Sequence, residues 1–119
     1  MTGVQTCSSD LFPSHDRSVG QFTNNKLIKI IEKPVNPPSN YAVIGAYIYD
    51  YRVFNMINNL QLSRRGEYEI TDINNMYIEL NQIKYTILNG FWSDAGTFDS
   101  LMTASTHMWK LNYPRQIKS

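Results

Sequence analysis

The chain has 119 residues, of which 42% are hydrophobic, and its formal net charge is +1 at pH 7. This length fits one small domain or part of a larger one, and the balanced charge gives no electrostatic case for nucleic acid or a membrane surface as a partner. A single cysteine, Cys7, excludes an internal disulfide and a multi-cysteine metal site. Without an apolar run of about 18–20 residues or a signal-peptide pattern, a cytoplasmic location is expected.

Residues 1 to roughly 20 differ in composition from the rest of the chain. They are rich in Ser, Asp, Thr and Gly and follow neither the period of a strand nor that of a helix. We expect the first ~12 residues to be poorly ordered. The stretch Met1–Leu11 also resembles translated sequencing-adapter DNA, so residues 1–18 are predicted to be a disordered or foreign tail.

A β-hairpin and a stiff loop are predicted next. The strands Val19–Thr23 and Lys26–Glu32 flank Asn24-Asn25, and asparagine tolerates the positive φ of a two-residue hairpin turn. Pro34 favours an extended backbone at Lys33, and further prolines stiffen the loop up to residue 40.

A run of nine uncharged residues, Tyr41–Tyr49, follows the loop. Such a run is typical of a central strand that is covered on both faces. Gly45 in its middle costs stability, which indicates close approach of a ligand or of another backbone. A β-bulge explains this glycine equally well.

Two helices are predicted after this strand. Asp50 is a suitable cap for a helix that begins near Tyr51 and whose apolar spacing continues to Leu60. A basic loop up to residue 66 separates it from a second helix, at about Thr71–Leu80, for which Thr71 is the expected N-cap.

A strand over Ile83–Leu88 and a helix over about Phe98–Leu111 complete the pattern. The order ββ-β-α-α-β-α predicts an α/β layer architecture. The residues predicted on the buried side of the last helix are Phe98, Leu101, Met102, Ser105, Met108 and Trp109.

Polar residues interrupt this scaffold in three clusters, Ile31–Pro34, Arg65–Asp72 and Phe91–Thr97. If the fold brings Lys33 and Arg65 to one cleft, the two cations suit a phosphate, and neighbouring glutamates suit sugar hydroxyls. Solvated surface charges explain the first two clusters equally well.

The third cluster contains Asp94 at a strand-to-helix junction. Ligands collect at such junctions in α/β proteins, and a carboxylate there suits a magnesium ion. On local sequence alone, the simpler interpretation is that Asp94 shapes the turn and Thr97 caps the helix.

Together the three clusters resemble the C-terminal half of the sugar-phosphate nucleotidyltransferases, and within that family the glucose-1-phosphate thymidylyltransferases. The resemblance spans roughly Val19–Ala104. It implies a Rossmann-like α/β fold with a mixed sheet flanked by helices, of which residues 19–119 are a truncated, partial domain. The matching segments, in family order, are Ile31–Pro34, parts of Ser39–Asp50, Arg65–Asn74 and Trp92–Thr97.

The resemblance also implies roles for individual residues. Lys33 and Arg65 would be the catalytic cations, and Asp94 would be one of two acidic Mg²⁺ ligands. The residues implied in binding the sugar phosphate are Glu32, Lys33, Val43, Gly45, Tyr47, Arg65, Glu67 and Trp92.

In such enzymes an oxygen of a sugar 1-phosphate attacks the α-phosphate of a nucleoside triphosphate, and pyrophosphate leaves. Alignment, Mg²⁺ and cationic side chains carry the catalysis. The resemblance implies a sugar 1-phosphate and a nucleoside triphosphate as partners, a homo-oligomer for the intact protein, and no nucleic acid or membrane partner.

Several features of the family are missing from these 119 residues. They include the Gly-rich loop that cradles the triphosphate, the base-contacting residues and the other Mg²⁺-binding Asp. The family's Tyr-Gly pair reads Arg17-Ser18 here, and the usual Asp of the hairpin turn is Thr23. We therefore expect a fragment that is inactive by itself. The alternative is a non-catalytic sugar- or phosphate-binding module, or a regulatory one, that pairs with another chain.

Overall fold

The structure is a computed structural model that describes residues 2–8, by their backbone, and residues 17–112. The chain divides into two compact units, unit 1 (Met1–Leu88) and unit 2 (Asn89–Ser119). Its elements in chain order are β1 (Thr2–Ser8), β2 (Val19–Thr23), β3 (Lys26–Ile31), β4 (Tyr41–Ile48), α1 (Arg52–Asn58), α2 (Ile70–Glu79), β5 (Ile83–Leu88) and α3 (Phe98–Asn112).

Unit 1 is built on a five-stranded mixed sheet in the order β3-β2-β4-β1-β5. The predicted central position of β4 is confirmed. β1 runs antiparallel to β4 and parallel to β5. It is therefore a strand of the sheet, although its sequence has no strand-like pattern. The expectation of poor order was wrong for Thr2–Ser8, because pairing on both sides satisfies backbone groups whatever the side-chain pattern.

The hairpin of β2 and β3 is confirmed. Its two strands are antiparallel, and the turn residues Asn24 and Asn25 have φ values of 50° and 59°. These positive values are the ones that a two-residue turn between twisted strands requires. The hairpin places β3 at the edge of the sheet.

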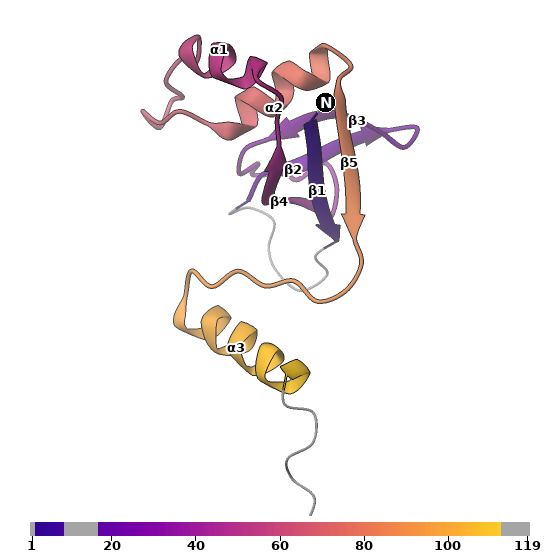
Figure 1. Cartoon of the computed structure of the whole chain (residues 1–119), viewed down its shortest axis with the longest axis vertical. Helices are drawn as coiled ribbons and strands as arrows, with labels where there is room; N and C mark the ends of the chain where they lie inside the picture. The colour runs from indigo at the N-terminus through magenta and orange to yellow at the C-terminus, as the bar shows by residue number, and fades with distance from the viewer. Residues whose placement is uncertain (1, 9–16, 113–119) are drawn as a thin grey trace, which may run out of the picture. The chain divides into compact units, whose positions relative to one another are not determined.

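Helix α2 packs across the sheet against β3, β1 and β5, and α1 packs against α2 (Figure 1). The resulting core has two parts, one between α2 and the strands and one between the two helices. The first contains the buried residues Leu27, Ile30, Val43 and Ile78, and the second contains Val53, Ile73 and Tyr77.

The second half of β4 is more exposed than its sequence predicted. Ile48 is 75% exposed, so the expectation of cover on both faces was wrong there. Between the pairs Val4–Tyr47 and Thr6–Val43, one residue of β1 faces three of β4, including Gly45. A Cβ at Gly45 would meet nothing within 4 Å. The register therefore favours the bulge as the explanation of this glycine.

Both helix caps of unit 1 differ from the prediction. Tyr51 is the N-cap of α1, and Asp50 lies one residue earlier, where its Oδ1 accepts a hydrogen bond from Arg52 N at 3.1 Å. Glu69 is the N-cap of α2. The assignment of Thr71 as the cap was wrong, because its hydroxyl bonds a distant side chain that the local pattern does not include.

The predicted cap of α3 is confirmed in unit 2. Thr97 Oγ1 accepts a hydrogen bond from Ser100 N at 3.1 Å, and Ser100 Oγ accepts one from Thr97 N at 3.0 Å. Such a reciprocal pair is a capping box with serine in place of the usual acid or amide.

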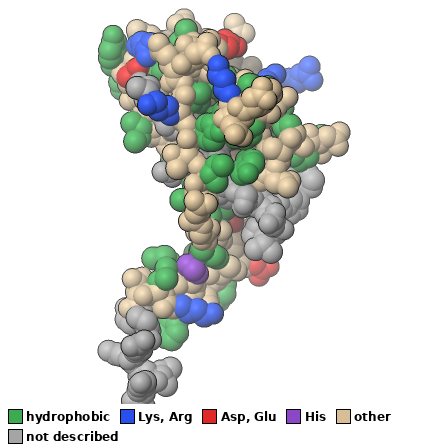
Figure 2. Space-filling view, turned by 90° about the vertical axis from the view of Figure 1, so that its right-hand side faces the viewer, with side chains coloured by type: hydrophobic (Ala, Val, Ile, Leu, Met, Phe, Trp, Pro, Cys, Tyr) green, Lys and Arg blue, Asp and Glu red, His purple; other side chains and the backbone are tan. Residues whose placement is uncertain are grey.

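The predicted buried side of α3 was wrong. Phe98 is 93% exposed, and Ser100 is the only buried residue among residues 89–112. An amphipathic pattern predicts a face that needs cover, and residues 89–112 leave this face exposed. Figure 2 shows hydrophobic side chains at the surface of both units. No described helix has the length and apolar character needed to cross a membrane.

Candidate functional site

Glu32 is the centre of a polar cluster in unit 1. It directly follows β3, and its Oε2 accepts hydrogen bonds from Ser18 Oγ at 2.5 Å and from Thr71 Oγ1 at 2.7 Å. Ser18 precedes β2, and Thr71 lies in the first turn of α2. The hairpin and the helix therefore meet at this carboxylate.

Arg65 approaches Glu32 from a turn between the two helices. Gly66, at φ 73°, closes this turn by donating its N–H to Ser63 O at 2.9 Å. The Arg65 guanidinium lies 2.8 Å from Glu67 Oε2, 3.5 Å from Glu69 Oε1 and 3.8 Å from Glu32 Oε1. Three carboxylates thus surround one cation, and a phosphate that binds Arg65 must compete with Glu67 for it.

Tyr47 is part of the same neighbourhood. Burial raises the pKa of its phenol, and the negative charge of Glu32 raises it further. Tyr47 also packs against the core cluster that contains Val43. Val43 itself is buried in that core, and Gly45 is exposed at the bulge.

Lys33 follows Glu32 and is exposed. Its φ is 41°, in the left-handed region, and its N–H donates to Arg17 O at 3.1 Å. The prediction of an extended backbone before Pro34 was wrong. The left-handed conformation of Lys33 goes together with the hydrogen bond from its N–H to Arg17, a residue that is distant in sequence. A left-handed backbone costs a non-glycine residue about 1–2 kcal/mol, and such strained residues are concentrated at functional sites.

Trp92 and Asp94 belong to unit 2, in the segment between β5 and α3. Ser93 Oγ donates to Asp94 O at 2.9 Å, and the Asp94 side chain is exposed. Residues 17–112 contain no group of three His, Cys, Asp or Glu side chains that would hold a metal ion. A carboxylate such as Asp94 fits one ligand position of Mg²⁺, which binds few protein carboxylates and completes its shell with phosphates and water.

Two residues that contact Glu32 were missed from the sequence, Ser18 and Thr71. The hairpin register contains a signal for the first. Val19 pairs with Ile31, so the preceding and following residues, Ser18 and Glu32, lie opposite each other. The signal for the second is absent from the local sequence, because it depends on how α2 crosses the sheet.

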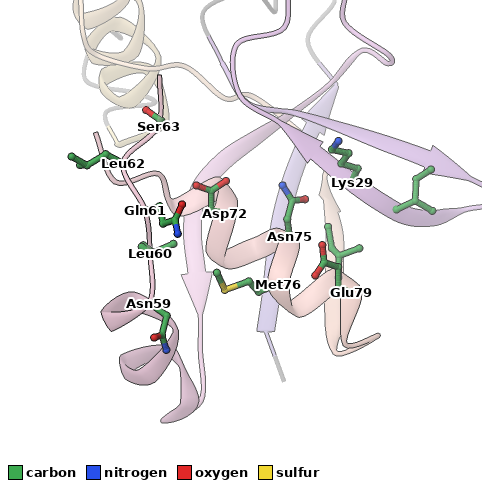
Figure 3. A pocket seen from close by; sticks show the side chains of 12 residues that line it. Lys29, Asn59, Leu60, Gln61, Leu62, Ser63, Asp72, Asn75, Met76 and Glu79 are labelled. Atoms are coloured by element: carbon green, nitrogen blue, oxygen red, sulfur yellow. The ribbon is translucent and has the colours of Figure 1, made fainter. Parts of the chain in front are cut away.

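A pocket of about 650 Å³ lies elsewhere in unit 1, between the exposed side of α2 and the segment that follows α1. Figure 3 shows Lys29 of β3 on one side of it and Leu60, Gln61 and Leu62 on the other. None of the predicted site residues lines this pocket. Its lining residues are Ile28, Lys29, Asn59, Leu60, Gln61, Leu62, Ser63, Asp72, Asn75, Met76, Ile78 and Glu79.

The Glu32 cluster combines hydrogen-bond acceptors with cations. Glu32 and Glu67 can accept hydrogen bonds from hydroxyl groups, while Arg65 carries positive charge that a phosphate needs, and the exposed Lys33 follows Glu32 in the chain. A ligand with both hydroxyls and a phosphate matches this combination.

Comparison with known proteins identifies the family of the chain. A family model described as nucleotidyl transferase matches residues 16–110. The glucose-1-phosphate thymidylyltransferase of Mycolicibacterium smegmatis is 44% identical over 84 residues, which are 69% of this chain and 29% of that protein. The chain spans less than a third of the length of the curated relatives it matches.

Solved structures agree with the fold. A Bacillus anthracis protein described as a glucose-1-phosphate thymidylyltransferase, in complex with sucrose, matches with a TM-score of 0.80 and 43% identity. The match covers 89% of this chain and 42% of that one. A UDP-glucose pyrophosphorylase complexed with UDP-glucose matches with a TM-score of 0.80 and 23% identity, over 92% of this chain and 44% of that one, and shows the shared fold alone.

Proposed function

The chain belongs to the nucleotidyl transferase family, and from this membership we propose that it is the sugar-phosphate-binding part of a glucose-1-phosphate thymidylyltransferase. The proposed reaction joins dTTP and glucose 1-phosphate to give dTDP-glucose and pyrophosphate. What supports the proposal is that Glu32 and Arg65, from two separate segments, lie 3.8 Å apart in unit 1, where the charge of Glu32 also raises the pKa of Tyr47. The identity of 44% with a thymidylyltransferase supports the choice of reaction.

Each residue has a proposed role in that reaction. Glu32 and Glu67 accept hydrogen bonds from the sugar, with Val43, Gly45, Tyr47 and Trp92 around it. Lys33 and Arg65 hold the phosphate and neutralise its charge as the oxygen attacks. Asp94 would hold Mg²⁺, which draws charge from the phosphates when bound.

We also propose where the partial nucleotidyltransferase domain begins. The family match begins at residue 16, and Val43 N donates to Ser18 O at 2.8 Å. We therefore propose that the family domain begins at residue 16 instead of Val19, and that β1 joins its sheet from outside the family match. The intact protein is proposed to be a homo-oligomer.

The test is an assay of the protein obtained by extending the source sequence upstream. We expect Mg²⁺-dependent pyrophosphate release from glucose 1-phosphate with dTTP preferred over UTP, CTP and GTP. Lys33→Ala and Arg65→Ala should each lower kcat/KM by about 100-fold, as expected for groups that stabilise transition-state charge. Lys84→Ala, on the exposed side of β5, is the matched control.

Two results would contradict the proposal in different ways. A preference for GTP would show that the assigned nucleotide is wrong. No pyrophosphate release with any of the four triphosphates would show that the chain is a binding or regulatory module instead.

A further inference from the structure

The Glu32 carboxylate is held by two hydroxyls from different elements. Ser18 Oγ and Thr71 Oγ1 both donate to Oε2, at 2.5 and 2.7 Å, and the two hydroxyl oxygens are 3.2 Å apart. A carboxylate oxygen offers about two lone-pair sites. The two hydroxyls therefore occupy the acceptor capacity of Oε2.

The other oxygen, Oε1, is in a different situation. Its nearest cation is Arg65, at 3.8 Å, which is longer than a hydrogen bond. Among the described residues, none donates a hydrogen bond to Oε1. The carboxylate thus has one oxygen that is used within the protein and one that can accept a hydrogen bond from a ligand.

The backbone around Ser18 is fixed by the sheet. Ser18 O accepts a hydrogen bond from Val43 N at 2.8 Å, and Arg17 O accepts one from Lys33 N at 3.1 Å. The Ser18 hydroxyl is therefore presented from a position tied to β4 and to the residue after Glu32. Ser18 replaces the glycine of the family's Tyr-Gly pair, so a glycine at this position would lack the hydroxyl.

We propose that Ser18, together with Thr71, is a positioning residue that orients Glu32 so that Oε1 alone is offered to a hydroxyl of the sugar. This inference rests on the proposed function for the identity of the ligand. A carboxylate with both oxygens available can accept two neighbouring sugar hydroxyls, whereas an oriented one accepts a single hydroxyl. Ser18 would then act on recognition of the sugar and leave recognition of the phosphate to Lys33 and Arg65.

The test uses the isotope-labelled 119-residue chain and compares Ser18→Ala with Ser18→Thr, which retains a hydroxyl. Without ligand, the NMR resonance of the Glu32 carboxyl carbon should move in Ser18→Ala and return towards the wild-type position in Ser18→Thr. Thr71→Val, which keeps the shape of the buried side chain, should also move it. Ser105→Ala, on the exposed side of α3, is the matched control.

Binding of two probes separates positioning from a general structural role. The Kd for glucose 1-phosphate should rise about tenfold in Ser18→Ala, as expected for the loss of a hydrogen bond to a charged group. The Kd for inorganic phosphate should stay unchanged. Equal weakening for both probes, or an unmoved Glu32 resonance, would overturn the inference.

One further outcome distinguishes this inference from the proposed function. If the resonance moves but the wild-type chain binds glucose 1-phosphate no better than inorganic phosphate, the hold of Ser18 on Glu32 is supported and the proposed substrate is wrong. If the wild-type chain prefers glucose 1-phosphate and Ser18→Ala binds it equally well, the substrate is supported and the role of Ser18 is wrong.

Discussion

Among the described acidic residues, Asp50 has a pKa that is clearly shifted by its neighbours. Its Oδ2 accepts hydrogen bonds from Arg52 Nε at 3.0 Å and from Arg52 Nη2 at 2.5 Å, and its Oδ1 accepts one from the Tyr77 hydroxyl at 2.8 Å. The Arg52 guanidinium holds the pKa of Asp50 well below its usual range; burial opposes this effect, and the Tyr77 hydroxyl adds to it. Because the carboxyl ionises more readily in the folded chain than in the unfolded chain, the ionised group stabilises the fold.

We therefore predict a pH-dependent effect of Asp50→Asn. The variant should unfold at a lower urea concentration than the wild type at pH 7, where the wild-type group contributes its full stabilisation. This difference in stability should begin to shrink when the pH falls below about 4, which is the pKa of an aspartate in the unfolded chain. It should keep shrinking until the pH reaches the lower pKa of Asp50 in the folded chain. Urea titrations across this range measure it. Glu79→Gln, at an exposed carboxylate, is the control, and a difference that stays constant with pH would contradict the prediction.

At the scale of the elements, Asn75 joins helix α2 to the edge strand β3. Ile30 N donates to Asn75 Oδ1 and Asn75 Nδ2 donates to Ile30 O, both at 2.8 Å. The side-chain amide thus pairs with the strand as a neighbouring peptide group would, and it covers part of an edge that would otherwise be open. The strand held in this way ends at Ile31 and leads directly into Glu32 and Lys33.

Removing this amide should destabilise unit 1. We predict that Asn75→Ala lowers the free energy of unfolding by about 2 kcal/mol, because two hydrogen bonds are lost and two backbone groups of a buried residue are left unpaired. Chemical denaturation measures this change. Asn58→Ala, at an exposed position near the end of α1, is the control. Equal effects of the two substitutions would show that the amide contributes nothing specific.

At the scale of the whole molecule, the sequence covers less than a third of the length of its curated relatives. Its described surface includes large apolar side chains, among them Ile48 at 75% exposed and Phe98 at 93% exposed. On the proposed assignment, the chain carries only the residues that bind the sugar phosphate. It lacks the Gly-rich triphosphate loop that the family resemblance leads us to expect.

We predict that the 119-residue chain releases no pyrophosphate from glucose 1-phosphate and dTTP in the presence of Mg²⁺. Without a triphosphate cradle the reacting groups are not aligned, and alignment supplies a large part of the rate of such a transfer. A coupled pyrophosphate assay measures the activity. Release that Asp94→Asn abolishes would contradict the prediction and would show that the residues present are sufficient for catalysis.

Some parts of the molecule could be predicted because their causes are local. The Asn24-Asn25 turn, the bounds of β5 and the capping of α3 by Thr97 depend on a few consecutive residues, and the structure confirms them. The family motifs around Glu32 and Arg65 are local in the same sense, because each is a short run of sequence.

Other parts were decided only by the tertiary structure. Thr71 bonds Glu32 instead of capping α2, Lys33 adopts a left-handed backbone before a proline, and Thr2–Ser8 forms a strand between β4 and β5. In each case a partner distant in sequence supplies the hydrogen bond, so neighbouring residues alone carry no signal for it. The sequence by itself thus determined the family and the elements from β2 to α3, while β1, the order of the strands and the orientation of the Glu32 carboxylate depend on long-range contacts.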